Sequence, residues 1–300
     1  MTEIVVGVDG SESSAAALRW AAHEAELHGS ELVAVLAWDL FNQHHPDGSR
    51  RFLPEYDDAH ADAALLAYAE AALGAEPAAR VIRRPVCDVP AQGLIEAAKG
   101  ADLLVLGARG LGGFRGLLLG SVSQQCLHHA TGPIAIVHLP RKGEAGAEGA
   151  AGRIVVGVDG SDSSQAALRW ALTEGALRHA TVEALLAWEV PVIYGPVVGA
   201  FPYDTDAIEA GAREHLDVAV AEALAAAGTP EVTVERTAVA GGPASLLLDA
   251  AEEADLVVIG RRGLGGFGRL MLGSVSEHVA RHARCPVVVL PPAPAVAAGE

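Results

Sequence analysis

The sequence predicts an α/β fold: two tandem copies, each an open, doubly wound sheet of five parallel strands flanked by helices. Two observations lead to this prediction. The segment Ile4–Ser11 (IVVGVDGS) returns unchanged as Ile154–Ser161, so the chain carries an internal repeat. Within each copy, short β-branched apolar runs alternate with stretches of helical spacing. Continuous apolar runs of this kind are typical of a parallel sheet that helices cover on both faces.

The first half of the first copy supplies two strands and two helices. Ile4–Val8 is the first predicted strand. Hydroxyl groups at residues 11–14 can cap the helix that follows, and Gly29 is a plausible end for it. Leu32–Trp38 is the second strand. A long irregular stretch over residues 39–57 then leads into an alanine-rich helix.

The second half of the first copy completes the sheet. Ala79–Val86 is a weaker third strand, and Pro90 suits the first turn of the next helix. Asp102–Leu106 is a fourth, buried strand. A glycine-rich loop follows it and enters a helix over residues 121–130, after which Ile134–Leu139 forms the fifth strand. Ligands of such sheets bind at the carboxyl ends of the strands, where the strand order reverses.

The second copy repeats this order and closes with the strand Pro286–Leu290. We therefore predict two nucleotide-binding domains, residues 1–140 and 153–292. The stretch 141–152 is rich in Gly, Ala and Glu and lacks apolar periodicity, so it reads as a flexible linker. Residues 293–300 form a tail.

The most informative motif follows the fourth strand of each copy. Residues 107–121 and 260–274 share the pattern Gly, two residues, Gly, nine residues, Gly-Ser. A strand that ends in a glycine loop and enters a helix commonly holds phosphate, because backbone N–H groups converge there and the helix dipole favours negative charge.

The chain is acidic, with a formal net charge of −17 at pH 7. This charge argues against general binding to nucleic acid or to an anionic membrane. Several arginines nevertheless gather near the two glycine loops. These arginines are either solvated surface charges or part of a local anion-binding site on an otherwise acidic protein. These residues are Arg109, Arg115, Arg261, Arg262 and Arg269.

Three features favour the cytoplasm. Cys87, Cys126 and Cys285 are isolated, which fits a reducing compartment and no zinc site. No basic segment precedes an apolar one at the N-terminus, so we expect no signal peptide. No uncharged apolar stretch reaches about 18 residues, so we expect no membrane span.

Other nucleotide motifs fit poorly. A Walker A loop needs a lysine beside its Ser or Thr, and neither glycine loop has one. The second loop contains Gly263-x-Gly265-x-x-Gly268, but a dinucleotide fingerprint belongs after the first strand, so we interpret this match as chance. No GxSxG elbow occurs, and no Ser/His/Asp set suggests a catalytic triad.

The combination of Val-Gly-Val-Asp-Gly-Ser after the first strand with the glycine pattern after the fourth resembles the universal stress protein family in its tandem, two-domain form. The resemblance covers nearly all of the chain outside the linker and the tail, and both copies keep the ATP-binding form of the motif. It implies a Rossmann-like α/β sandwich of five strands. It also implies dimer-like pairing, for which the fifth strands, Ile134–Leu139 and Val287–Leu290, are the expected edges. A further homodimer stays open.

The resemblance also assigns roles to residues. Asp9 and Asp159 match the carboxylate that binds ribose, although either could simply cap a helix. Ala37 and Ala187 fall where backbone groups meet adenine, or they are small core residues. The complete predicted ATP site is Gly7, Asp9, Ala37, Gly107, Arg109, Gly110, Arg115, Gly120, Ser121, Val122 and Ser123 in the first copy, and Gly157, Asp159, Ala187, Gly260, Arg262, Gly263, Arg269, Gly273, Ser274, Val275 and Ser276 in the second.

The loop glycines have a structural alternative, which is turn formation with positive φ. Arg115 and Arg269 are candidates for the terminal phosphate, but their registers differ by one residue, which puts the equivalence of the two sites in doubt.

We therefore predict a cytosolic ATP-binding stress-response protein with one ATP per domain. It would act as a regulator or sensor, and Mg²⁺ would accompany the triphosphate. Two alternatives stay open. One is a nucleotide-dependent transferase or slow ATPase on the same fold. The other is an assembly scaffold with vestigial sites.

Overall fold

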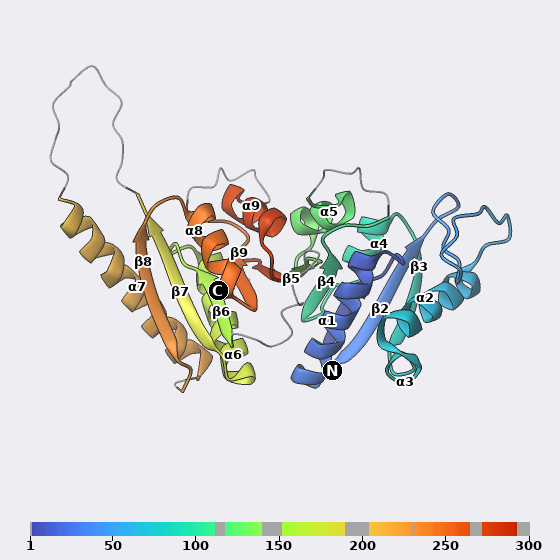
Figure 1. Ribbon diagram of the computed structural model, residues 1–300, viewed down its shortest axis with the longest axis horizontal. Coiled ribbons are helices and arrows are strands. Elements are labelled where there is room, and N and C mark those ends of the chain that lie inside the picture. Colours follow the sequence, from blue (N-terminus) through green and yellow to red (C-terminus); the bar gives the residue numbers. More distant parts are fainter. Residues whose placement is uncertain are drawn as a thin grey trace, which may run out of the picture. The chain divides into compact units, whose positions relative to one another are not determined.

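The chain is described by a computed structural model over residues 2–111, 118–139, 152–189, 204–229, 231–264 and 272–292 (Figure 1). The predicted tail and, except for Gly152, the predicted linker lie outside these residues. The chain divides into two compact units. Of the described residues, those up to 139 and those from 280 to 291 form the first unit, and those from 152 to 279 belong to the second.

The first unit contains the predicted doubly wound sheet. Its parallel strands run in the order β3-β2-β1-β4-β5. Their bounds are Glu3–Gly7 for β1, Glu31–Trp38 for β2, Ile82–Cys87 for β3, Leu103–Gly107 for β4 and Ile134–Val137 for β5. One strand comes from the second sequence repeat: β10 (Val287–Leu290) pairs with β5 in the antiparallel direction. The two strands expected to pair through their edges therefore do so.

Helices cover both faces of this sheet. The bounds are Glu12–His28 for α1, Asp58–Leu73 for α2, Ala75–Ala78 for α3, Pro90–Ala97 for α4 and Ser121–His129 for α5. Helices α1 and α2 pack against each other and against the sheet, and α4 and α5 form a second such pair. The Ser11 side chain caps α1 by accepting from the Ser14 N–H at 3.1 Å, and Pro90 opens α4, as the sequence predicts.

The second unit repeats the pattern with the strand order β8-β7-β6-β9. Its strands are β6 (Arg153–Gly157), β7 (Thr181–Trp188), β8 (Val234–Ala240) and β9 (Leu256–Gly260). Its helices are α6 (Asp162–Arg178), α7 (Thr205–Ala227), α8 (Pro243–Ala250), the 3₁₀ turn η1 (Ala251–Glu253) and α9 (Ser274–His282), of which residues 280–282 belong to the first unit. Helix α6 ends at His179, which adopts the left-handed conformation (φ 55°). The equivalent helix of the first copy, α1, ends at Gly29 in the same conformation.

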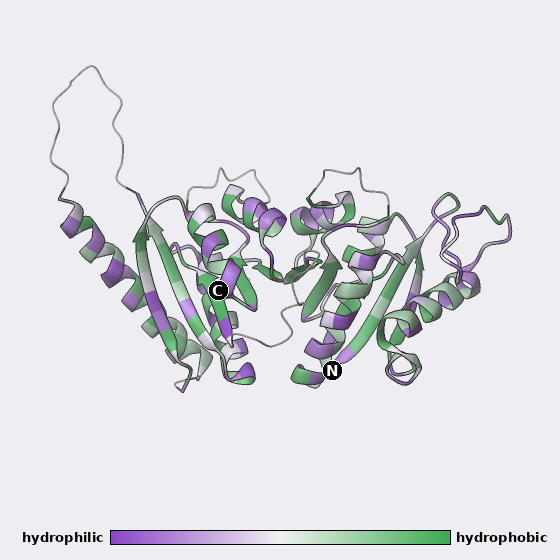
Figure 2. Ribbon diagram, viewed as in Figure 1, coloured by the Kyte–Doolittle hydropathy of each residue, from purple (hydrophilic) through white to green (hydrophobic). Residues whose placement is uncertain are grey.

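The strands, which are mostly green in Figure 2, supply much of the core of both units, and helix side chains such as Leu18 and Leu168 complete it. Val5, Val6, Val155 and Val156 are fully inaccessible to solvent. Because neighbouring residues of a strand point to opposite faces, this burial requires cover on both sides of the sheet. The α/β fold predicted from the continuous apolar runs is thus confirmed.

The sheet order decides where functional groups meet. Strands β1 and β4 are direct neighbours, with Val6 opposite Val105, so the loops that leave their carboxyl ends lie side by side. Asp9 follows β1 and the glycine loop follows β4, which places them at one end of the sheet. Within the described residues, no helix is long and apolar enough to cross a lipid bilayer.

Candidate functional site

A cavity of about 500 Å³ opens at this end of the first unit. Every residue of the predicted first-copy site that the structure describes lines it. These residues are Gly7, Asp9, Ala37, Gly107, Arg109, Gly110, Gly120, Ser121, Val122 and Ser123. Arg115 lies outside the described residues. The volume is within the range of ligand pockets, roughly 300–1,000 Å³.

Asp9 joins the two loops at the floor of the cavity. Its Oδ1 accepts from the Ser11 N–H at 2.9 Å, and its Oδ2 accepts from the Leu111 N–H at 3.1 Å. The Ser14 hydroxyl oxygen accepts from the Asp9 N–H at 3.3 Å. Since each carboxylate oxygen has two lone pairs, both oxygens can accept one more hydrogen bond from a ligand hydroxyl.

The loop glycines permit close approach between chain segments. A Cβ atom on Gly110 would lie 2.6 Å from Asp9 Oδ2, and one on Gly107 would lie 2.6 Å from the Ser13 carbonyl oxygen. Neither glycine has positive φ, and neither do their second-copy counterparts, Gly260 and Gly263. The alternative role of positive-φ turns therefore does not apply at these four positions, where the loop requires the absence of a side chain.

Helix α5 presents its N-terminus to the cavity. Gly120 is the N-cap with an extended φ of −74°, and no side chain caps the helix within the described part of the chain. Residues 121–123 of the first turn line the cavity, and their N–H groups have no acceptor in the preceding turn. The Ser123 hydroxyl is buried and donates to the Gly107 carbonyl at 2.8 Å, so its proton already holds the end of β4. Ser121 is exposed.

Segment 39–57 supplies lining residues that the sequence analysis missed. Asn42, His44 and Arg50 line the cavity, opposite the predicted motif. Asn42 Nδ2 donates to the Ala37 carbonyl at 3.2 Å, so one backbone group expected to face adenine already has a partner. The available signal was a cluster of polar residues directly after the carboxyl end of the second strand.

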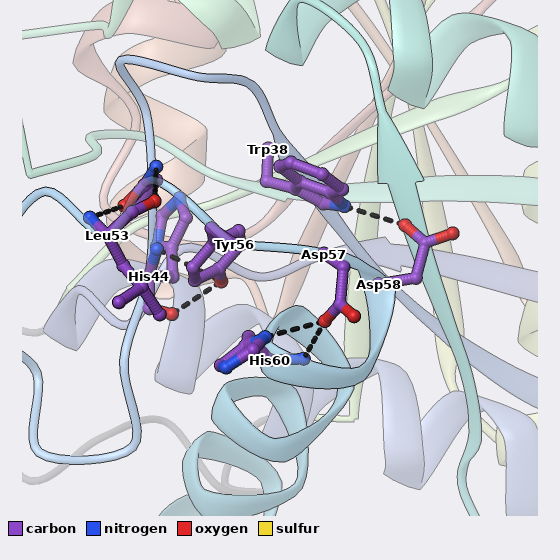
Figure 3. Close-up of polar contacts among 8 residues, drawn as sticks. Trp38, His44, Leu53, Tyr56, Asp57, Asp58 and His60 are labelled. Carbon is purple, nitrogen blue, oxygen red and sulfur yellow. Dashed lines mark hydrogen bonds and ion pairs between the residues drawn. The ribbon is translucent and has the colours of Figure 1, made fainter.

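His44 is the most deeply buried of these residues, with 1% of its surface exposed. Burial, and then the positive charge of Arg50, lower the pKa of its imidazole to about 4. At neutral pH the ring is therefore uncharged. Figure 3 shows its neighbour Tyr56, which holds the His44 main chain.

The second copy repeats the arrangement around its aspartate. Asp159 accepts from the Ser161 N–H at 3.0 Å and from the Leu264 N–H at 3.1 Å. The Ser276 hydroxyl donates to the Gly260 carbonyl at 2.7 Å, as Ser123 does to Gly107. The same two loops are thus joined in the same way.

Other second-copy positions differ or are not described. Arg261 is buried and burial lowers the pKa of its guanidinium, whereas Ala108 occupies the corresponding position in the first copy. Arg269 and residues 190–203, which correspond to much of segment 39–57, lie outside the described residues. Arg262 N–H donates to the Ser163 hydroxyl at 3.3 Å, which fixes the start of the glycine loop. Six further predicted site residues, Gly157, Ala187, Gly263, Gly273, Ser274 and Val275, flank these loops at the ends of β6, β7 and β9 and at the start of α9.

Comparison with known proteins finds members of one family. Residues 1–138 and 151–291 each match the model of the universal stress protein family. Universal stress protein Rv2623 of Mycobacterium tuberculosis is 36% identical over 304 residues, covering 95% of each chain. A universal stress protein of Mycolicibacterium smegmatis is 33% identical over 96% of this chain and 97% of its own. A solved universal stress protein from Archaeoglobus fulgidus, 23% identical, shares the fold with a TM-score of 0.67 over 96% of this chain and 98% of its own.

Proposed function

Because this chain belongs to the universal stress protein family, we propose that it is a cytoplasmic stress-response protein that binds one ATP per domain and responds to occupancy rather than to turnover. The observation that carries the proposal is the first-copy cavity. There the Asp9 carboxylate, the glycine loop after β4 and the uncapped N-terminus of α5 face one space of about 500 Å³.

The lining residues fit the parts of a nucleotide. Asp9 would accept hydrogen bonds from the sugar. The first-turn N–H groups of α5 would bind phosphate oxygens, with support from the helix dipole and from Arg109, which is exposed at the cavity. Val35, Leu94 and Leu106 offer apolar surface for a base. Mg²⁺ would be held mainly by the phosphates and water.

Binding without rapid turnover follows from the chemistry of the lining. None of the described residues that line the cavity is a lysine. The one imidazole there, on His44, has a pKa of about 4, so it is a weak base at neutral pH. The Asp9 carboxylate already accepts two backbone hydrogen bonds. A sensor that responds to binding needs neither a lysine nor a strong base at the phosphates.

Two measurements test the proposal. Mass spectrometry of small molecules released from the denatured, purified protein should detect an adenine nucleotide. Isothermal titration with Mg-ATP should give two sites per chain, one site in Asp9→Ala or Asp159→Ala, and none in the double variant. Asp249→Asn, which alters an exposed carboxylate on α8, is the matched control and should keep two sites. Titration heats that are flat at micromolar protein, together with no released nucleotide, would refute the proposal.

A further inference from the structure

Segment 39–57 is irregular in backbone but fixed by hydrogen bonds. The Tyr56 hydroxyl accepts from the His44 N–H at 3.2 Å and donates to the His44 carbonyl (Figure 3). The Gln43 side chain donates to the Leu53 carbonyl at 2.9 Å and accepts from the Leu53 N–H at 2.7 Å. Gln43, His44 and Tyr56 are all buried. The segment therefore forms an ordered wall of the cavity. The hydrogen bonds of Gln43 and Tyr56 hold His44 in its position.

His44 lines the cavity, and one nitrogen of its ring has no hydrogen-bond partner among the described residues. The residue is 1% exposed and lines the cavity, yet its Nδ1 has no hydrogen-bond partner among the described residues. Leaving a buried polar atom unpaired costs about 1–3 kcal/mol, so native structures seldom do it without a reason. A bound molecule with an O–H or N–H group would supply the missing partner.

The surroundings of the ring indicate which part of a nucleotide it would meet. The Asp9 carboxylate charge and a hydrogen bond to the Asp9 main chain both raise the pKa of the His44 imidazole, so the two residues are close in space. Asp9 is the group proposed to bind the sugar. A ligand that reaches Asp9 would therefore bring its sugar hydroxyls near His44.

The sequence that follows β7 in the second copy has no counterpart of this side chain. Residues 189–204, which follow β7 as segment 39–57 follows β2, read EVPVIYGPVVGAFPYD and contain no His, Asn or Arg. The residues around the two aspartates match closely, whereas the sequences that follow the second strand do not.

We propose that His44 is a sugar-recognition residue of the first site, where its Nδ1 hydrogen-bonds a ribose hydroxyl of the bound nucleotide. This inference rests on the proposed function, because it takes a ribonucleotide as the ligand. It makes the two sites chemically distinct. The first discriminates among sugars through Asp9 and His44, whereas the stretch that follows β7 supplies no histidine beside Asp159.

The test combines protein variants with sugar variants of the ligand. In an Asp159→Ala background, which retains the first site, affinities are measured for ATP, 2′-deoxyATP and 3′-deoxyATP. His44→Phe should weaken ATP binding about tenfold. It should also shrink the penalty for one of the two deoxy analogues about tenfold, because the lost hydroxyl and the lost imidazole are partners. In an Asp9→Ala background, which retains the second site, His44→Phe should change nothing.

A second pair of variants separates recognition from packing. Asn places a polar atom near the position of Nδ1, whereas Gln places one near Nε2. His44→Asn should keep most of the sugar discrimination, and His44→Gln should lose it. If the background protein binds ATP but discrimination is equal in all variants, the inference is wrong and the proposed function stands. If the background protein binds no nucleotide, both fail.

Discussion

The substitution Gly110→Ala tests the cavity at its tightest point. The added Cβ would lie 2.6 Å from Asp9 Oδ2, closer than such atoms approach in proteins. The contact is with a carboxylate that is held from both sides, by the Ser11 and Leu111 N–H groups. Because the backbone at Gly110 is not left-handed, alanine could adopt the same conformation. The substitution should therefore act only through the clash between its Cβ and the Asp9 carboxylate.

The expected magnitude follows from the hydrogen bond that the clash breaks. The Leu111 N–H donates to Oδ2 at 3.1 Å, and a hydrogen bond to a charged group contributes about 1.5–3 kcal/mol. Since Asp9 is the proposed sugar ligand, its displacement should weaken ATP binding at the first site by about 10- to 100-fold. The same loss should lower the melting temperature of the first unit by about 5 °C.

The assay is isothermal titration in an Asp159→Ala background, with thermal melting followed by circular dichroism. Gly132→Ala is the matched control, because its Cβ would find its nearest neighbour, the Ala101 carbonyl oxygen, at 3.7 Å. Gly263→Ala, where the Cβ would also meet the carboxylate of Asp159, should impair the second site alone. Normal ATP affinity in Gly110→Ala would show that the Asp9 carboxylate does not bind the ligand.

Three further predictions address segment 39–57 and the helix ends. Tyr56→Phe removes the hydroxyl that bonds both backbone groups of His44, so it should cost about 1–2 kcal/mol and speed hydrogen exchange in the segment. His179→Gly should stabilise the second unit by about 0.5–1 kcal/mol in denaturant titration, because residue 179 is exposed and left-handed. The His44 pKa of about 4 lies below its unfolded value, so the unfolded chain binds the extra proton between pH 6.5 and 4. The first unit should therefore lose about 2 kcal/mol from this group between pH 7 and pH 5, and a pH dependence unchanged in His44→Phe would contradict this assignment.

Much of the fold and of the cavity could be predicted because the relevant signals are local. The apolar run at 4–8 and its return at 154–158 report buried parallel strands directly. Strand order then brings Asp9 to the glycine loop without any further assumption, since β1 and β4 are neighbours. The positive-φ alternative for the loop glycines does not hold, because Gly107, Gly110, Gly260 and Gly263 all have negative φ. A single sequence does not distinguish a glycine needed for positive φ from one needed for close approach.

Segment 39–57 could not be predicted because its structure depends on contacts between distant positions. Gln43 bonds Leu53 and Tyr68 bonds the carbonyl of His45, pairings that have no periodicity to detect. Its few regular features are local, such as the Asp39 side chain that accepts from the Asn42 N–H at 2.9 Å. This network places His44 at the cavity. The sequence alone shows that a histidine is present in the segment but does not predict its position.

The division between local and distant contacts explains how a duplicated chain can hold two different sites. The bonds that join Asp9 to Leu111 and Asp159 to Leu264 are the same length, 3.1 Å, because each arises from a short motif that both copies keep. The wall after the second strand is not part of that motif, so it can change without disturbing the loops. A nucleotide affinity measured at one site therefore cannot be assigned to the other. If His44 acts as inferred, the shared motif determines that a nucleotide binds, and the wall determines which sugar is preferred.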